Sequence, residues 1–326
     1  MVGFTTSVPI EVILAANCKP VDLNNIFISD KNSDILLEKA ETKGFPRNTC
    51  SWIKGIYSVI KSNKEINKVI NVVEGDCSNT KALMEVLEYD GIECISFAYP
   101  KKRDYLLMKS EIENLCKYLN VSIEKANLMK KKLYQIRKDI KYFDELTWKH
   151  NKVNGFENHY WLVSSSDYFG DILTYSELLK AAIKKAENSK SLDERVRLGY
   201  IGVPPIFNDI YEVVESFDAR VVFNEVQRQF TMYDSNDEND IVKEYLNYTY
   251  PYDLKARLLD IKEQIKKREI NGIIHYTQSF CFRGIEDILI RKNLDVPILT
   301  IEGDRPGKID ARTKLRIEAF IDMLNE

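Results

Sequence analysis

The sequence lacks any hydrophobic run long enough to cross a membrane. Nothing in it approaches the roughly 18 consecutive apolar residues that a spanning helix needs. The opening stretch, MVGFTTSVPIEVILAAN, has no basic n-region, and its short apolar run is interrupted by Glu11, so it does not resemble a signal peptide. We therefore expect a cytoplasmic protein with no membrane partner.

An excess of basic residues is also absent. The chain has 47 Lys and Arg against 50 Asp and Glu, for a formal net charge of −3. Such a balance creates no bulk field for polyanions, so nucleic acid is not an expected partner. The Lys-rich run Lys130–Lys132 is interpreted as a solvated helix face.

Cysteine and histidine are both scarce. Six cysteines in 326 residues are too few and too scattered for a disulfide scaffold. The histidines, His150, His159 and His275, include no His-x-x-x-His pair, so a zinc site of that type is excluded.

Motifs for nucleotide phosphates are missing as well. No GxGxxG occurs, and the loop Gly303–Lys308 is one residue short of a Walker A motif with no Ser or Thr after Lys308. If the reaction uses nucleotide energy, another chain is expected to bind the nucleotide.

What the sequence does contain is a regular alternation of short Val/Ile/Tyr/Phe runs with amphipathic stretches. This alternation predicts strand–helix units of the α/β class with parallel sheets, and its two separate series predict two sheets. Strands are expected at Val21–Ile28, Lys68–Val73, Glu93–Tyr99, Leu198–Val203, Arg220–Phe223, Gly272–Tyr276 and Val296–Ile301. Helices are expected from about Ile10, Ile53 and Thr80, within Phe207–Phe217, and over Gly284–Lys292 and Ala311–Leu324.

The predicted helices of Arg103–Trp148 separate the two series, with apolar residues at helical spacing among many Lys and Glu. We expect an N-terminal α/β domain over residues 1–150, with this helical linker from about residue 103. The C-terminal α/β domain covers 151–326, and its final helix packs back. Lys185–Glu194 and Asp234–Asp240 are expected to be loops. A cleft between two such domains, at the carboxyl ends of the strands, is where ligands usually bind.

Two cysteines lie on predicted strand-to-helix turns: Cys77 in VVEGDCSNT and Cys281 in GIIHYTQSFCFRGIED. Cys50, in GFPRNTCSWIKG, shows the pattern less cleanly. The positive end of the following helix favours the thiolate form. Three thiolates on three loops could hold one soft metal centre, and an iron–sulfur cluster is the natural candidate. Their spacing matches no local ligand rule, so the alternative, buried thiols acting as small hydrophobes, stays open.

Segments spread over most of the chain resemble the 2-hydroxyacyl-CoA dehydratase family, including the 2-hydroxyglutaryl-CoA dehydratase D-component. They are PIEVILAANCKPVDL, CSWIKGIY, VVEGDCSNT, KKRDYLLMKSEIENL, GYIGVPPIFNDIYEVVESFDARVVFNE and the ending from GIIHYTQSFCFRGIEDILIRK to RIEAFIDML. The resemblance implies two flavodoxin- or Rossmann-like domains joined by helices. It also implies a [4Fe-4S] cluster in the interdomain cleft, held by Cys50, Cys77 and Cys281.

The same resemblance implies a reaction. In this family a separate ATP-dependent activator with its own iron–sulfur cluster delivers one low-potential electron, and the substrate thioester becomes a ketyl radical that expels its 2-hydroxyl group. An iron–sulfur-dependent lyase acting on an acyl-CoA is therefore implied, as a homodimer or as a heterodimer with a related subunit. Thr5, Glu11 and Gln278 are weak candidates for orienting the leaving hydroxyl or supplying protons. Each is more often a helix cap or a satisfied core polar group.

Two alternatives stay open. A related branch, the double-cubane [8Fe-9S] cluster proteins that reduce small molecules, needs six thiolates. Six cysteines fit this number, but Cys18, Cys94 and Cys116 lie in segments that do not suggest ligands, so one cubane is favoured. The chain also departs from the family at Phe280 and Phe282-Arg283, where an aspartate commonly follows the cysteine. A non-catalytic two-domain ligand-binding protein is the other alternative.

Overall fold

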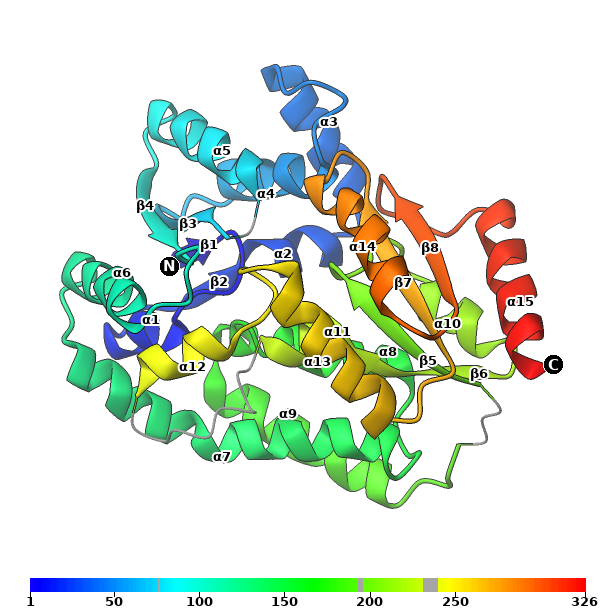
Figure 1. The fold of residues 1–326 in the computed structure, drawn as a ribbon. Helices are drawn as coiled ribbons and strands as arrows, with labels where there is room; N and C mark the ends of the chain where they lie inside the picture. Colours follow the sequence, from blue (N-terminus) through cyan, green and yellow to red (C-terminus); the bar gives the residue numbers. More distant parts are fainter. Residues whose placement is uncertain (76, 193–195, 231–239) are drawn as a thin grey trace. The chain divides into compact units, whose positions relative to one another are not determined.

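The computed structural model describes residues 1–75, 77–192, 196–230 and 240–326 (Figure 1). By packing, the chain forms two compact units, each assembled from three separated segments. Unit 1 consists of Met1–Lys138, Ser164–Ser176 and Thr231–Asp253, and unit 2 of Asp139–Val163, Glu177–Phe230 and Leu254–Glu326, as far as these are described.

Unit 1 contains a four-stranded sheet in the order β2-β1-β3-β4, and all of its pairings are parallel. Its strands are β1 (Val2–Phe4), β2 (Pro20–Asp22), β3 (Lys68–Glu74) and β4 (Glu93–Ala98). The interior of β3, Val69–Val72, is fully buried, as expected for a strand covered on both faces of a parallel sheet.

The helices of unit 1 fill the connections between these strands and add two later segments. They are α1 (Ile10–Ala15), α2 (Leu23–Ser29), α3 (Ser33–Lys43), α4 (Ser51–Ser62), α5 (Ser78–Tyr89), α6 (Tyr105–Tyr118), most of α7 (Ile123–Trp148), the 3-10 turn η1 (Tyr168–Gly170) and α12 (Ile241–Asn247). Helix α5 packs on β3 and β4, and α6 packs on β4.

Unit 2 contains a second all-parallel sheet in the order β6-β5-β7-β8. Its strands are β5 (Val196–Gly202), β6 (Ala219–Asn224), β7 (Gly272–Gln278) and β8 (Ile298–Gly303). Its helices are α8 (Gly155–Ser164), most of α9 (Ile172–Glu187), α10 (Ile210–Glu215), α11 (Glu225–Gln229), α13 (Leu254–Lys267), the 3-10 helix η2 (Phe282–Glu286), α14 (Asp287–Asn293) and α15 (Ala311–Asn325).

The core of unit 2 joins the sheet to the helices that follow its strands. Phe223 of β6 and Ile273 of β7 pack with Ile261 of α13 and Ile290 of α14, and all four side chains are buried. Burial of such side chains is the main stabilising term in folding. Helix α15 packs on α10, β5 and β8, so the final helix lies back on unit 2.

The predicted fold class is confirmed: the chain is α/β with two parallel sheets, consistent with two flavodoxin-like domains. In each unit the first strand is central, the second lies on one side of it and the third on the other. The strand order therefore reverses between β1 and β3 and between β5 and β7. In open α/β sheets, ligands bind outside the carboxyl ends of strands at such switch points.

Several predicted elements differ from the structure. Val21–Ile28 is not one strand, because Asp22 ends β2 and caps α2 by accepting a hydrogen bond from the Asn24 backbone N–H (2.9 Å). The three-residue β1 was not predicted, since so short a strand has little periodic signal. The segment Gly284–Lys292 is helical but in two pieces, η2 and α14.

The two predicted loops differ in part from the structure. Lys185–Glu187 belongs to α9 rather than to a loop. Of the second predicted loop, Asp234–Asn239 lies outside the described residues, and Asp240 is the N-cap of α12.

The two predicted helices of Arg103–Trp148 are present as α6 and α7. Helix α7 begins in unit 1 and ends in unit 2. The division into domains 1–150 and 151–326 stays a prediction, whereas the packing units interleave along the chain. No helix within the described ranges is long and apolar enough to cross a membrane.

Candidate metal centre

Cys77 lies at the carboxyl end of β3, where the chain turns into α5. It is the N-cap of α5 and has an extended backbone conformation. The turn starts at Gly75, whose φ is +95°. A Cβ at this position would lie 2.6 Å from the Pro251 carbonyl oxygen and 2.6 Å from Tyr99 Cβ, so only glycine fits. The sequence around Cys77 is thus built for one tight strand-to-helix turn.

Cys281 occupies the corresponding place in unit 2, after β7 and at the N-cap of η2. Its backbone N–H donates to the Gln278 carbonyl (3.0 Å), and its own carbonyl accepts from the Gly284 N–H (3.1 Å). Phe280, which lies between Gln278 and Cys281, adopts a left-handed φ of +64°, a conformation that non-glycine residues rarely adopt. Cys281 is partly exposed, and its neighbours Phe280 and Phe282 are exposed.

Cys50 is the N-cap of α4 and is buried, with 6% of its surface exposed. It follows helix α3 and a loop, as expected from Pro46 and Asn48, whereas the strand-to-helix turns predicted for Cys77 and Cys281 are confirmed. The buried ammonium of Lys54 holds the preceding loop by donating to Glu41 Oε1 (2.8 Å) and to the Arg47 carbonyl (3.1 Å).

The three cysteines thus share one local feature, the N-terminal end of a helix. Free backbone N–H groups and the helix dipole there favour negative charge. Deprotonated thiolates are the form that binds soft metals. Sequence alone located all three caps.

The remaining cysteines have a different environment. Burial raises the pKa of Cys94, on β4, to about 11 and that of Cys116, on α6, to about 11. The Cys94 thiol lies 3.9 Å from the Met84 carbonyl, and the Cys18 thiol 3.7 Å from the Ala16 carbonyl. Raised pKa values disfavour thiolates, in line with the interpretation of Cys94 and Cys116 as small buried hydrophobes.

Two of the weak catalytic candidates make the contacts of core polar groups. Thr5 Oγ1 accepts a hydrogen bond from the Val72 N–H (3.1 Å). Gln278 Oε1 accepts from the Tyr276 hydroxyl (2.9 Å), and its Nε2 donates to the Asp304 carbonyl (2.8 Å). Both side chains are buried, and a proton role for either stays a prediction.

The third candidate, Glu11, belongs to a buried ionic cluster within unit 1. Its carboxylate is paired with Arg137 and accepts a hydrogen bond from the Tyr245 hydroxyl (3.0 Å). Arg137 Nη1 also lies 2.6 Å from Glu244 Oε1, and Lys130 Nζ lies 3.3 Å from Glu244 Oε2. Both contacts are ion pairs between buried groups, so Coulombic attraction holds Glu244 in the cluster.

This cluster corrects the interpretation of Lys130–Lys132 as a solvated helix face. Lys131 and Lys132 are exposed, but Lys130 is buried against Glu244. Burial raises the pKa of Glu244 to about 7, against the opposing charge of Arg137. Arg137 and Glu244 were missed, because the partners are far apart in the sequence and neither residue type stands out on an amphipathic helix.

The chain was then compared with known proteins. A family model described as 2-hydroxyglutaryl-CoA dehydratase, D-component, matches residues 5–324. The chain belongs to this D-component family. The chain is therefore an enzyme component of the 2-hydroxyacyl-CoA dehydratase type. Dehydratases of this type are lyases. A search of curated proteins found no match.

The cysteines of this D-component suit an iron–sulfur group by their chemistry. Cys50 and Cys77 belong to unit 1 and Cys281 to unit 2, so the predicted ligand set draws on both units. Within the described ranges no three His, Cys, Asp or Glu side chains gather into a metal-binding group. Thiolates at helix N-termini nevertheless form the donor set that such clusters use, and the residues present therefore fit the group.

Proposed function

We propose that this chain is the cluster-bearing component of a reductive 2-hydroxyacyl-CoA dehydratase. One [4Fe-4S] cluster is bound by the thiolates of Cys50, Cys77 and Cys281. A separate ATP-dependent activator with its own iron–sulfur cluster supplies a low-potential electron. The partner is a related subunit or a second copy of this chain, and the substrate is an acyl-CoA.

The observation that carries this proposal is the equivalence of Cys77 and Cys281. Each follows the third strand of its sheet, next to the switch point, and each caps the following helix. Cys50 adds a third thiol at a helix N-terminus. A structural role for these thiols would not require such matched positions.

When bound, the cluster supplies one-electron transfer and, with three protein ligands, one iron open to a substrate oxygen. The protein residues have separate tasks. The helix N-termini of α4, α5 and η2 stabilise the thiolate charge. The close packing of Gly75 against Pro251 and Tyr99 fixes the backbone that leads to Cys77. Glu11, Thr5 and Gln278 are the candidates for moving or directing a proton.

The test is the iron and acid-labile sulfide content of the anaerobically purified chain, with low-temperature EPR after dithionite reduction. We expect about four irons per chain and a reducible cubane signal. The single variants Cys50→Ala, Cys77→Ala and Cys281→Ala should lose the cluster. Cys94→Ala and Cys116→Ala are the matched controls and should keep it.

Other results would redirect the proposal. Full iron content in one of the three alanine variants would remove that residue from the ligand set. About eight irons per chain, lost in the control variants, would indicate a double cubane instead. No iron after careful reconstitution would leave a ligand-binding protein. Turnover of 2-hydroxyacyl-CoA that needs both the activator and ATP would then test the reaction itself.

A further inference from the structure

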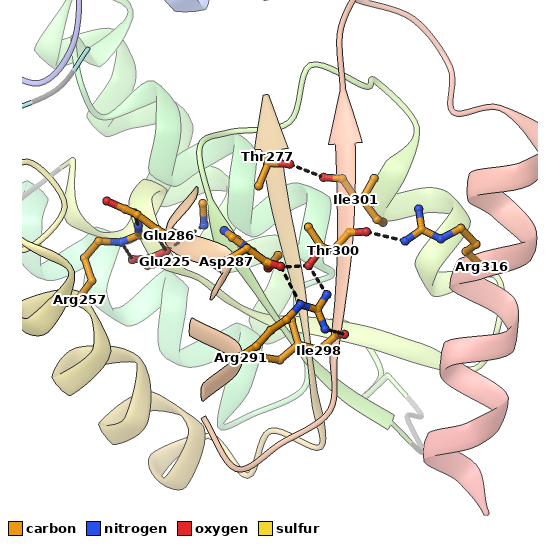
Figure 2. A network of polar contacts seen from close by, with 12 residues as sticks. Glu225, Arg257, Thr277, Glu286, Asp287, Arg291, Ile298, Thr300, Ile301 and Arg316 are labelled. Atoms are coloured by element: carbon orange, nitrogen blue, oxygen red, sulfur yellow. Dashed lines mark hydrogen bonds and ion pairs between the residues drawn. The ribbon is translucent and has the colours of Figure 1, made fainter. Parts of the chain in front are cut away.

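Two consecutive carboxylates, Glu286 and Asp287, stand where η2 ends and α14 begins. They lie five and six positions after Cys281 in the same short helical segment. Their side chains engage different partners, so the helical segment headed by Cys281 is held in two directions (Figure 2). Both sets of partners belong to unit 2.

Glu286 connects this segment to β5 through Arg257 and Glu225. It is paired with Arg257 of α13, and its other oxygen accepts from Arg283 Nη1 (3.0 Å). Arg257 in turn makes a two-point contact with Glu225, at 2.7 and 2.8 Å, a geometry that fixes both side chains. Glu225 Oε2 accepts from the Gly202 N–H (2.9 Å) at the end of β5.

The charges in this chain of contacts balance. Glu225 and Glu286 face Arg257 and Arg283. Although burial opposes ionisation, the charge of Arg257 keeps the pKa of Glu225 below its ordinary value. This set of four groups therefore carries no net charge.

Asp287 connects the same segment to β7 and β8. Its Oδ1 accepts from His275 Nδ1 of β7 (2.7 Å) and from the Thr300 hydroxyl of β8 (2.6 Å). Its Oδ2 accepts from Arg291 Nε (2.7 Å). Burial acts to raise the pKa of Asp287, but the hydrogen bonds from Thr300, His275 and Arg291 lower it, so the carboxylate is ionised near neutral pH.

We propose that Glu286 and Asp287 are positioning residues that orient the Cys281 thiolate for the cluster. A five-residue 3-10 helix has little stability of its own, so its direction is set by what holds its far end. The two carboxylates connect that end to β5, β7 and β8. This inference rests on the proposed function, in which Cys281 is a cluster ligand.

The experiment compares the full-length wild type with Glu286→Gln, Asp287→Asn and the control Asp295→Asn, an exposed acid just after α14. We expect the first two variants to lower iron affinity by about 10- to 100-fold, as loss of supporting hydrogen bonds does at metal sites. They should also change the EPR line shape of the reduced protein. The control should match the wild type in both readouts.

A second readout needs no cluster. In iron-free protein, the rate of Cys281 alkylation by iodoacetamide, resolved by peptide mass spectrometry, should change severalfold in both variants. Cys77 in unit 1 should react at the wild-type rate and serves as the internal control. Thr300→Val, which removes the hydrogen bond to Asp287 and one from Arg291, gives a second test of the Asp287 contacts if Asp287→Asn fails to fold.

The outcomes separate the two proposals. A wild type without iron, together with altered Cys281 alkylation in the variants, would end the cluster proposal but keep the positioning role. Iron affinity, EPR signal and Cys281 alkylation all at wild-type values in the folded variants would overturn the positioning role while leaving the cluster proposal intact.

Discussion

The two units have the same strand order, yet they hold their cysteine turns by different means. In unit 1 the turn to Cys77 depends on a close backbone approach at Gly75, against Tyr99 and Pro251. In unit 2 the segment after Cys281 is held by two carboxylates and their Arg, His and Thr partners. Equal topology therefore places the thiols at equal strand ends, while the local chemistry that fixes them differs.

The buried charges of the two units also differ in how much solvent reaches them. In unit 1, Glu11 and Glu244 are fully buried around Arg137. In unit 2, Arg257 faces one fully buried carboxylate, Glu225, and a second, Glu286, whose side chain is still 19% exposed. A charge that keeps some contact with water destabilises the folded state less when its partner is removed. The same substitution should therefore lower the free energy of unfolding by different amounts in the two units.

The largest expected effect is that of Arg137→Met. It leaves two buried carboxylates without their shared cation, so the free energy of unfolding should fall by about 3–5 kcal/mol. Arg257→Met should cost less, because only one of its two carboxylate partners, Glu225, is fully buried, while Glu286 keeps some contact with water. Urea unfolding followed by circular dichroism measures both, with the exposed Arg312→Met as the control. A loss for Arg137→Met no greater than that of the control would break the comparison.

A smaller effect is expected from Gly75→Ala in unit 1. The added Cβ meets two atoms at 2.6 Å and the φ is +95°, so the free energy of unfolding should fall by about 3 kcal/mol. The control is Gly91→Ala, with a φ of +82° but no atom within 4 Å, which should cost only about 1 kcal/mol. Equal losses in thermal or urea unfolding would mean that the close approach at Gly75 does not matter.

The smallest effect concerns pH. Burial raises the pKa of Glu215, in unit 2, from 4.5 to about 7. The folded state then binds more protons than the unfolded chain between these two values, so this group lowers stability as pH rises through that window. Glu215→Gln should remove this loss. Its stability relative to wild type should increase from pH 4.5 to about 7 and then level off.

The same measurement sharpens the comparison of the units. In unit 1, burial raises the pKa of Asp167 from 3.8 to about 7, so the gain in Asp167→Asn should begin at lower pH. Glu212→Gln, an exposed position on the helix of Glu215, is the control and should show no such trend. A stability difference between Glu215→Gln and wild type that does not change with pH would contradict the raised pKa of Glu215.

Much of the fold was predictable from local pattern. Lys68–Val73 and Gly272–Tyr276 could be recognised as strands because parallel strands covered on both faces are continuous apolar runs. The error at Val21–Ile28 arose because Asp22, between the apolar Val21 and Leu23, acts as a helix cap. Its cap contact is local, but the choice between strand and helix there depends on neighbours in the sheet.

In the candidate site, too, local features could be predicted from the sequence and contacts between distant residues could not. The helix-capping positions of Cys50, Cys77 and Cys281 follow from short segments of sequence, since a cap is a local feature. The partners of Glu11 could not be predicted, because Arg137 and Tyr245 are distant from it in the chain. No spacing rule connects such residues.

The sequence by itself determined the α/β class, the two parallel sheets and the placing of three thiols at helix N-termini. These properties depend on the period of apolar residues and on residues next to each other in the chain. Only the tertiary structure decided that Lys130 is buried, that Glu286 and Asp287 hold the Cys281 segment, and that separated segments interleave in each unit. The physical reason is that ion pairs and hydrogen bonds between distant residues form only where packing brings them together, and no local pattern encodes that.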